Sequence, residues 1–246
     1  MVKIPKKKVA VVTGGTRGIG RGVVVELLKS GYFVFCNYYM NEKAFNEASE
    51  YFSSFDNPID IYKSDLSTKE GAFDYINHIK NMTDSIDVIV LNVATTCKDN
   101  FEDMAYEDWT KVMDTNLNIP FYMIQQLYEK LSENGRIVAI GSILGIYPHS
   151  ISIPYGVSKA GLNHLVKSLV KVLAKKKITI NAVCPGFVNT DWQNTKPTAL
   201  RRKIENKIAL KRFAEVSEIV SMCMSVINNS YINGAIIPID GGYDYE

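Results

Sequence analysis

Short runs of apolar residues alternate along the chain with longer stretches in which apolar residues recur at helical spacing. Most of the short runs are apolar throughout, as expected for strands that are covered on both faces of a parallel sheet. They predict strands at residues 8–13, 33–37, 59–63, 88–92, 136–141, 179–184 and 235–239. Between them, residues such as Phe73, Ile76 and Ile79 follow the helical period. Repeated strand–helix–strand units predict an α/β fold, a single doubly wound domain over residues 1–246 with about seven parallel strands and helices on both faces.

Two segments depart from this rhythm. Pro120 falls inside the otherwise helical stretch 106–131, which predicts a kink around Asn116. The segment 191–213 is polar, contains Pro197 and carries a short basic helix. It follows the carboxyl end of a strand, where α/β folds place loops that cover ligands, so we expect it to cover the substrate.

Composition and charge narrow the class of protein. The chain has 246 residues, 46% of them apolar and 22% charged, with a formal net charge of +2. Such a balance is typical of a globular protein and offers no broad basic field for nucleic acid. No apolar stretch approaches the ~20 residues that a membrane-spanning helix needs, and the N-terminal lysines lead into a short strand. We therefore expect a cytoplasmic protein without a membrane or nucleic-acid partner.

The cysteines and histidines show no ligand pattern. Cys36, Cys97, Cys184 and Cys223 are far apart, contain no CxxC pair and mostly lie in or beside apolar runs. They are predicted to be free thiols, most of them buried. His78, His149 and His164 also lack metal-ligand spacing, so the sequence predicts no metal site.

A glycine-rich turn, Thr13-Gly14-Gly15-Thr16-Arg17-Gly18-Ile19-Gly20, joins the first predicted strand to the first helix. Glycines allow a tight turn and close backbone approach, and the amides of a helix N-terminus can receive a pyrophosphate. A plain turn is the alternative, but this position in a strand–turn–helix unit favours a dinucleotide. The expected cofactor contacts in the turn are Gly14, Thr16, Arg17, Gly18, Ile19 and Gly20.

The end of the second strand bears on the choice of dinucleotide. It reads Cys36-Asn37-Tyr38-Tyr39, without the acid that would accept a ribose 2′-hydroxyl and repel a 2′-phosphate. Arg17 in the glycine turn offers a charge-assisted contact to such a phosphate. These features favour NADP(H) over NAD(H).

A tyrosine and a lysine stand four residues apart at Tyr155 and Lys159, on one face of a predicted helix. Chance alone produces such pairs, and Tyr39 with Lys43 is a second copy that we interpret as a surface accident. Only Tyr155 follows a Gly141-Ser142 pair at the end of a central strand, where it would face the cofactor crevice. A phenol with a pKa of about 10 donates or accepts a proton poorly near neutrality, and an adjacent ammonium stabilises its phenolate.

These motifs, in this order, resemble the short-chain dehydrogenase/reductase family over essentially the whole chain. The glycine turn has that family's spacing, Thr-Gly-x3-Gly-x-Gly, instead of the Rossmann spacing Gly-x-Gly-x2-Gly. The resemblance implies a Rossmann-type fold and a catalytic set of Tyr155, Lys159 and Ser142, with Asn116 as the family's structural asparagine. Tyr155 would be the acid in carbonyl reduction and the base in alcohol oxidation. Ser142 would orient the carbonyl, Lys159 would also hold the nicotinamide ribose, and Asn116 would hold a water that relays protons to Lys159.

Further cofactor contacts are expected beyond the glycine turn. They are Tyr38, Asp65, Leu66, Asn92, Pro185, Gly186, Val188 and Thr190, in addition to Tyr155 and Lys159. Asp65 matches the family's adenine-contacting aspartate, and its alternative role is to cap the following helix. The family's Asn-Asn-Ala-Gly reads Leu91-Asn92-Val93-Ala94 here, so we expect the cofactor wall to persist without the backbone contact that the glycine allows.

The expected substrate pocket is largely apolar. Its walls should come from residues 143–154 and 191–213, with side chains of Ile143, Ile146, Tyr147, Ile151, Ile153, Phe187 and Trp192, and with His149 at the lip or in solvent. Thr190-Asp191, Lys211-Arg212-Phe213, Asn233-Gly234 and Asp240-Gly241-Gly242 look like bacterial 3-oxoacyl-acyl-carrier-protein reductases. That resemblance implies NADP(H)-dependent reduction of a ketone to a secondary alcohol in an acyl thioester.

Partners and rival functions follow from the same features. An acidic acyl carrier protein would need a basic face, for which Lys171, Lys175, Lys176 and Lys177 are candidates, although Glu129 lies near the expected second contact. The alternatives are a short-chain dehydrogenase acting on a sugar, polyol or other small alcohol, and a non-catalytic dinucleotide sensor. The resemblance also implies a homotetramer through the helices at 106–131 and 155–176, which carry apolar residues on more than one face.

Overall fold

Seven strands form one parallel sheet at the centre of the molecule. The computed structural model describes residues 7–148, 152–193 and 196–243. The strand order is β3-β2-β1-β4-β5-β6-β7. The strands are β1 (Val9–Val12), β2 (Phe33–Tyr38), β3 (Ile59–Lys63), β4 (Ile86–Leu91), β5 (Leu131–Ile140), β6 (Thr179–Pro185) and β7 (Ile236–Ile239). The chain winds outward from β1 to β3 and then crosses back to place β4 beside β1, which confirms the predicted doubly wound α/β class.

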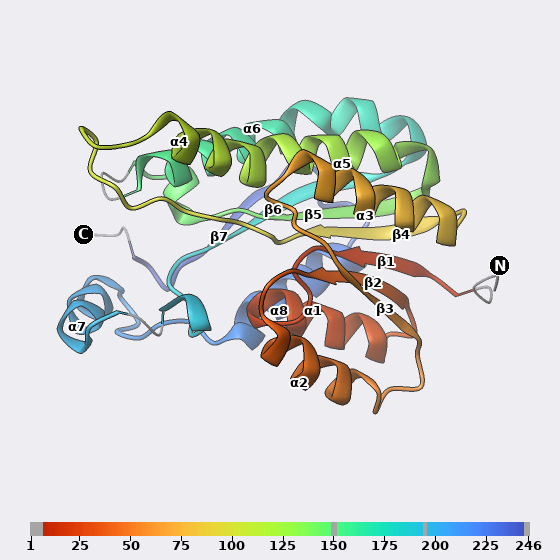
Figure 1. Cartoon of the computed structure of the whole chain (residues 1–246), viewed down its shortest axis with the longest axis horizontal. Coiled ribbons are helices and arrows are strands. Elements are labelled where there is room, and N and C mark those ends of the chain that lie inside the picture. Colours follow the sequence, from red (N-terminus) through yellow and green to blue (C-terminus); the bar gives the residue numbers. More distant parts are fainter. Residues whose placement is uncertain (1–6, 149–151, 194–195, 244–246) are drawn as a thin grey trace.

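Helices cover both faces of the sheet (Figure 1). α1 (Gly18–Lys29), α2 (Glu42–Phe52) and α8 (Val216–Asn228) cover one face, and α3 (Lys69–Met82), α4 (Tyr106–Met113), α5 (Ile119–Leu127) and α6 (Ile153–Leu173) cover the other. α7 (Thr198–Lys207) lies apart from both layers, at the end of the molecule toward which the strands point their carboxyl ends. This end is where a doubly wound sheet binds ligands.

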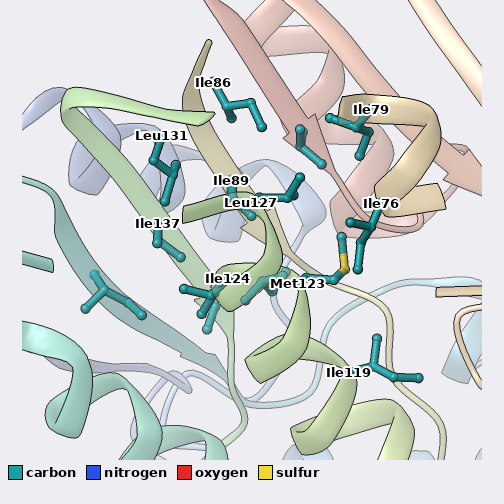
Figure 2. Packing of buried hydrophobic residues seen from close by; sticks show 14 of the residues in the cluster. Ile76, Ile79, Ile86, Ile89, Ile119, Met123, Ile124, Leu127, Leu131 and Ile137 are labelled. Carbon is teal, nitrogen blue, oxygen red and sulfur yellow. The ribbon is translucent and has the colours of Figure 1, made fainter. Parts of the chain in front are cut away.

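β1 is apolar throughout because its alternate side chains enter two different cores. Val9 and Val11 of β1 belong to the core under α3, α5 and α6, whereas Ala10 and Val12 belong to the core under α1 and α8. Figure 2 shows the first of these cores, with Leu127 of α5 packed among isoleucines of the strands and of α3. Burial on both faces fixes the register of each central strand, and hence the position of the loop that follows it.

The predicted helix 106–131 is interrupted where the kink was expected. α4 ends at Met113, a π-helical turn covers Asp114–Asn118, α5 follows, and a 3-10 turn at Tyr128–Lys130 ends the run. Pro120 has no N–H to donate to the carbonyl of Asn116, so a regular α-helical turn is not available there. The wide turn instead buries Asn116 completely.

The fifth strand begins earlier than the sequence predicts. Leu131 already pairs with Ile86 of β4, five residues before the predicted start at Arg136. A register shift then separates this pair from the regular ladder, and Asn134 adopts a left-handed φ of 62°. The polar residues of this irregular stretch break the apolar run, which is why the pattern alone placed the start of the strand too late.

The cysteines are free thiols, as predicted. All four cysteines are free, and Cys36, Cys184 and Cys223 are buried.

The segment 191–213 is partly helical. The expected basic helix is α7, and a 3-10 turn at Asp191–Gln193 precedes it. Within the described residues, no helix has both the length and the hydrophobicity needed to cross a membrane.

Candidate active site

A cavity of about 250 Å³ opens at the carboxyl edge of the sheet, where the loops after β1, β4, β5 and β6 meet. Most of the residues predicted from the motifs line it. These are Gly14, Arg17, Gly18, Ile19, Asn92, Ser142, Tyr155, Lys159, Pro185, Gly186, Val188 and Thr190. The glycine turn lies in the same cavity as the tyrosine and the lysine, which is the juxtaposition that hydride transfer from a bound dinucleotide requires.

The glycine turn presents an open helix N-terminus to this cavity. Gly14 and Gly18 have left-handed φ values of 67° and 53°, which other residues adopt only with strain. A Cβ on Gly20 would lie 2.2 Å from the Gly14 carbonyl oxygen, so only glycine lets the helix pack this closely. Arg17 precedes α1 in an extended conformation, and its side chain makes no cap hydrogen bond. The first N–H groups of α1 are therefore available to a phosphate.

Side-chain amides hold the turn against its neighbours. Asn37 of β2 accepts a hydrogen bond from the Gly14 N–H at 2.8 Å and donates to the Ser64 carbonyl at 3.0 Å. Asn92 donates from its side chain to the carbonyl of Thr13 at 2.9 Å, and its backbone N–H donates to the Thr13 hydroxyl at 2.7 Å. The altered Leu91-Asn92-Val93-Ala94 segment thus keeps the wall beside the turn.

Tyr155, Ser142 and Lys159 come together beside the end of β5. The side chains of Tyr155 and Ser142 both line the cavity, and the Ser142 hydroxyl lies close enough to lower the pKa of the phenol. The Lys159 ammonium donates to the Ile140 carbonyl at 2.6 Å, and its Nζ lies 5.7 Å from the centre of the Tyr155 ring. Gly145 lets α6 pass close by, because a Cβ at this position would lie 2.6 Å from the backbone carbon of Lys159.

Burial shifts both titrating groups in this cluster. The low-dielectric surroundings raise the pKa of Tyr155 to about 12, although its hydrogen bond with Ser142 acts in the opposite direction. The Lys159 side chain is almost fully buried, and this loss of solvation lowers its pKa to about 8. Near neutral pH the tyrosine is therefore a phenol and the lysine an ammonium, which is the pair of protonation states that proton donation to a carbonyl oxygen needs.

Asn116 sits behind the cluster rather than in the cavity. Its side chain accepts from the Thr95 N–H at 2.8 Å and donates both to the Thr95 carbonyl at 2.9 Å and to the Ser158 hydroxyl at 3.0 Å. Ser158 in turn donates to the carbonyl of Tyr155 at 2.8 Å. Asn116 thus connects the loop after β4 to the turn of α6 that carries Tyr155. Sequence reasoning missed Ser158, although it lies within the Tyr155–Lys159 motif.

Several predicted cofactor contacts lie outside the cavity. Thr16 and Leu66 are buried, Gly20 packs against Gly14, and Tyr38 stacks on Phe45. The carboxylate of Asp65 accepts from the Ser67 N–H at 2.8 Å. The alternative role of Asp65 as the cap of the next helix is wrong, because Thr68 caps α3.

The described substrate wall is smaller than predicted. Trp192 lines the cavity, with its ring 6.4 Å from that of Tyr155. Ile143 is buried away from the cavity lining, and Phe187 packs on Phe213. His149 and Ile151 lie outside the described residues.

Motif reasoning did not assign some cavity residues to the cofactor site. Besides the substrate-wall residue Trp192, they are Val93, Ala94, Ile140, Gly141, Asp191 and Gln193, which lie close to predicted residues at strand ends or in the loop after β6. Gln193 is distinctive because its side-chain oxygen is buried without a hydrogen-bond partner. A buried acceptor of this kind is costly unless a ligand supplies a donor.

Two other constellations lie away from this cavity. Tyr39 and Lys43 are exposed, and Lys43 lies 3.9 Å from Glu47, in line with the interpretation of this pair as a surface accident.

Cys97, Asp99 and Asp108 bring potential metal-ligand atoms within 4.8 Å of one another. The Cys97 thiol donates to Asp99 at 3.0 Å, and this hydrogen bond raises its pKa, which disfavours the thiolate that binds metals. The absence of a metal stays a prediction.

Comparison with known proteins places the chain in a family. The family model "short chain dehydrogenase" matches residues 8–200. A 3-oxoacyl-[acyl-carrier-protein] reductase of Aquifex aeolicus is 32% identical, with 96% of each chain covered. An acetoacetyl-CoA reductase of Rhizobium meliloti is 33% identical, covering 96% of this chain and 98% of the relative.

Solved structures agree with this result. The RhlG/NADP active-site complex of Pseudomonas aeruginosa matches with a TM-score of 0.87 and 28% identity over 96% of each chain. A short-chain dehydrogenase/reductase from Serratia marcescens matches with a TM-score of 0.90 and 25% identity, covering 97% of this chain and 98% of that one. The chain belongs to the short-chain dehydrogenase family and is an NAD(P)-dependent oxidoreductase.

The geometry of the glycine turn predicts the effect of a Gly14→Ala substitution. Alanine would strain the left-handed backbone and place its Cβ 2.9 Å from the Val93 side chain. We expect the Kd for NADPH, measured by fluorescence titration, to rise about tenfold or more. Gly31→Ala is the matched control, because Gly31 also has a positive φ of 85° but nothing within 4 Å of its Cβ position. Equal effects of the two substitutions on Kd would contradict the close-approach argument.

The buried ammonium predicts a pH-dependent stability gain for Lys159→Met. Lowering the pKa from 10.5 to about 8 corresponds to a penalty of about 3 kcal/mol that is fully present below pH 8, where the lysine is charged in both states. Between about pH 8 and 10.5 the folded protein is neutral at this site while the unfolded chain is still charged, so the penalty falls progressively and is gone above pH 10.5. We expect urea unfolding to show the variant as the more stable protein at pH 7, with a smaller advantage at pH 10. A gain that does not depend on pH would rule out this cause.

Proposed function

We propose that this protein uses NADPH to reduce the ketone of a 3-oxoacyl thioester to a secondary alcohol. The observation that carries the proposal is the grouping of Tyr155, Ser142 and Lys159 in the same cavity as the glycine turn. The names of the relatives support the substrate class, because they include both 3-oxoacyl-carrier-protein and acetoacetyl-CoA reductases.

In this mechanism the chain supplies the proton and the alignment. NADPH, when bound, supplies a hydride to the carbonyl carbon. Ser142 and Tyr155 hydrogen-bond the carbonyl oxygen, and Tyr155 gives its phenolic proton to this oxygen as negative charge develops on it. Lys159 stabilises the resulting phenolate through its charge, and the alcohol product leaves after the phenolate is reprotonated.

Asn116 has a positioning role in this proposal. Its side-chain amide is already engaged by Thr95 and Ser158, so a water that relays protons to Lys159 would bind its backbone carbonyl. The α-helical donor to that carbonyl, four residues further on, is missing because residue 120 is proline. The π-helical turn thus serves both the packing of the site and the proposed proton path.

The charges near the glycine turn support NADP(H) as the cofactor. Arg17 lines the cavity and is exposed, and its guanidinium has no hydrogen-bond or ion-pair partner among the described residues. Glu42, the first residue of α2, is the acid closest in sequence after β2, but Lys63 and Tyr38 both hydrogen-bond its carboxylate. The negative charge at this edge is therefore compensated, while the arginine is free for a 2′-phosphate.

The contacts in the predicted carrier-protein face weaken that surface as a docking site. Lys176 lies 3.6 Å from Glu129, and Lys177 lies 2.6 Å from Glu133. Two of the four candidate lysines are thus compensated by acids. We accordingly keep the thioester as the proposed substrate and treat the identity of its carrier as a separate question.

The proposed assembly is a homotetramer formed through α4, α5 and α6. These helices expose large apolar side chains, namely Tyr106, Tyr122, Val157 and Val172. Exposed apolar residues grouped on adjacent helices are typical of subunit contacts.

The free guanidinium predicts that Arg17→Gln lowers the preference for NADPH. Loss of a charge-assisted contact should raise the Kd for NADPH by about tenfold while the Kd for NADH changes little. Arg202→Gln on exposed α7 removes the same charge elsewhere and should leave both constants unchanged. If both Kd values rise equally after Arg17→Gln, Arg17 binds a part that the two cofactors share.

The proposed proton donor predicts that Tyr155→Phe abolishes reduction of acetoacetyl thioesters. We expect turnover, followed as NADPH absorbance, to fall at least about 100-fold because the carbonyl oxygen loses its acid. The Kd for NADPH should stay within a factor of about two, and Tyr39→Phe should behave as wild type. The same assay is run with free ketones, sugars and polyols. Preferred turnover of a sugar or polyol, or unchanged turnover in the variant, would contradict the proposal.

A further inference from the structure

Asn189 stands between two residues that line the active-site cavity, but its own side chain turns elsewhere. Val188 and Thr190 line the cavity. The side-chain oxygen of Asn189 accepts a hydrogen bond from the Arg201 guanidinium at 2.6 Å, and its side-chain nitrogen donates to the Glu215 carboxylate at 2.5 Å. Arg201 belongs to α7, twelve residues further along the chain. The contact therefore joins α7 to the wall of the cavity.

The hydrogen bond between Arg201 and Asn189 also closes the base of a loop that carries part of the cavity lining. The lining residues between the two are Thr190, Asp191, Trp192 and Gln193. The ring centres of Trp192 and Tyr155 lie 6.4 Å apart. A contact that holds the ends of a loop together restricts the conformations of the residues between them. The placement of Trp192 beside the proposed proton donor thus depends on this contact.

Arg201 is held in place for this contact on two further sides. Its Nε donates to Glu205, four residues further along α7, at 2.9 Å, and its guanidinium carbon lies 4.3 Å from the centre of the Phe213 ring. Phe213 is buried and packs on Phe187, so the guanidinium rests on a rigid surface. The planar fork of an arginine can serve Asn189 and Glu205 at once, whereas a lysine has a single nitrogen.

α7 has few other means of attachment. None of its residues is buried, and Leu200 is exposed. No other side chain of α7 hydrogen-bonds to a described residue outside the helix. Since the helix has no buried apolar face to hold it, loss of the Arg201 contact should release the end of the loop that α7 carries.

The other end of the loop is held independently of Arg201. The Asn189 N–H donates to the Ala214 carbonyl at 2.8 Å, and the Asn189 side chain donates to Glu215, the N-cap residue of α8. Removing the Arg201 guanidinium should therefore leave the cofactor side of the wall in place and free the part of the loop that carries Trp192.

We propose that Arg201 is a positioning residue that holds the Trp192 loop beside Tyr155, so that the substrate ketone is presented to the proton donor. The inference rests on the proposed function for the identity of the substrate, whereas the hold on the loop can be measured without turnover. Loss of the contact should weaken the binding of the substrate and change the binding of the cofactor little.

The first experiment follows the motion of Trp192 without cofactor or substrate. Trp109 is the only other tryptophan of the chain, so a Trp109→Phe background leaves Trp192 as the single reporter. In this background we expect Arg201→Met to raise the amplitude of the fast, nanosecond component of the fluorescence anisotropy decay at least about twofold. Methionine keeps an apolar contact with Phe213 and removes the charge and the hydrogen bonds.

Arg202→Met is the matched control for this experiment. Arg202 is the next residue of α7, is exposed and has no hydrogen-bond or ion-pair partner among the described residues. We expect its decay to equal that of the parent protein. An unchanged decay in Arg201→Met, or the same change in both variants, overturns the inference.

The second experiment measures KM and kcat for an acetoacetyl thioester and the Kd for NADPH. Arg201→Met should raise KM about tenfold, change kcat less than about threefold and leave the Kd within a factor of about two. Arg201→Lys should recover part of the loss, because it keeps one donor for Asn189. A KM that does not change, or a Kd for NADPH that rises as much as KM, overturns the inference.

A double-mutant cycle tests whether the contact with Asn189 is the cause. Asn189→Ala removes the same hydrogen bond from its other side, so adding Arg201→Met to it should raise KM less than about twofold further. Effects that multiply independently would place the action of Arg201 elsewhere and overturn the inference. If the wild type reduces no acetoacetyl thioester, the proposed function fails, and the anisotropy experiment still decides whether Arg201 holds the loop.

Discussion

The buried ammonium of Lys159 is the constraint around which the site is built. An ammonium without solvent is costly, and this one has a single described acceptor, the Ile140 carbonyl at the end of β5. It stays there because α6 is held close by Gly145 and because Asn163 donates to the Gly145 carbonyl at 3.2 Å. The fold thus accepts a loss of stability at one position to keep a positive charge beside a phenol, as is common where function and stability conflict.

Three asparagine side chains fix the positions of the loops around the active site. Asn37 connects the glycine turn to the end of β3, Asn92 connects β4 to β1, and Asn116 connects the loop after β4 to α6. Each bridges segments that are distant in the sequence, and each is paired on both its donor and acceptor sides or shares its donor between two carbonyls. Buried amides satisfied in this way fix loop positions better than apolar contacts, which tolerate sliding.

The sequence predicts much of the fold because central parallel strands are apolar on both faces, and it predicts the motif residues because glycines, Tyr155 and Lys159 have local signatures. The sequence does not predict features that depend on contacts between segments distant along the chain. The early start of β5 depends on the pairing of Leu131 with Ile86. The contacts of Asn116 depend on a π-helical turn, and Pro120 is the only residue in the sequence that indicates an irregularity there. Asp65 is a further case, since only the structure shows that its carboxylate accepts from the Ser67 N–H while Thr68 caps the helix.

An unpaired guanidinium marks the proposed cofactor site, although the whole chain carries a formal net charge of only +2. Arg17 stands at the glycine turn, so the 2′-phosphate of the cofactor would be bound far from the carbon that reacts. Binding energy gained at such a remote group can be used to align the nicotinamide with the ketone. The reacting region itself then needs only a few polar atoms, and Ser142, Tyr155 and Lys159 supply them on rigid elements that the two-faced core holds in register.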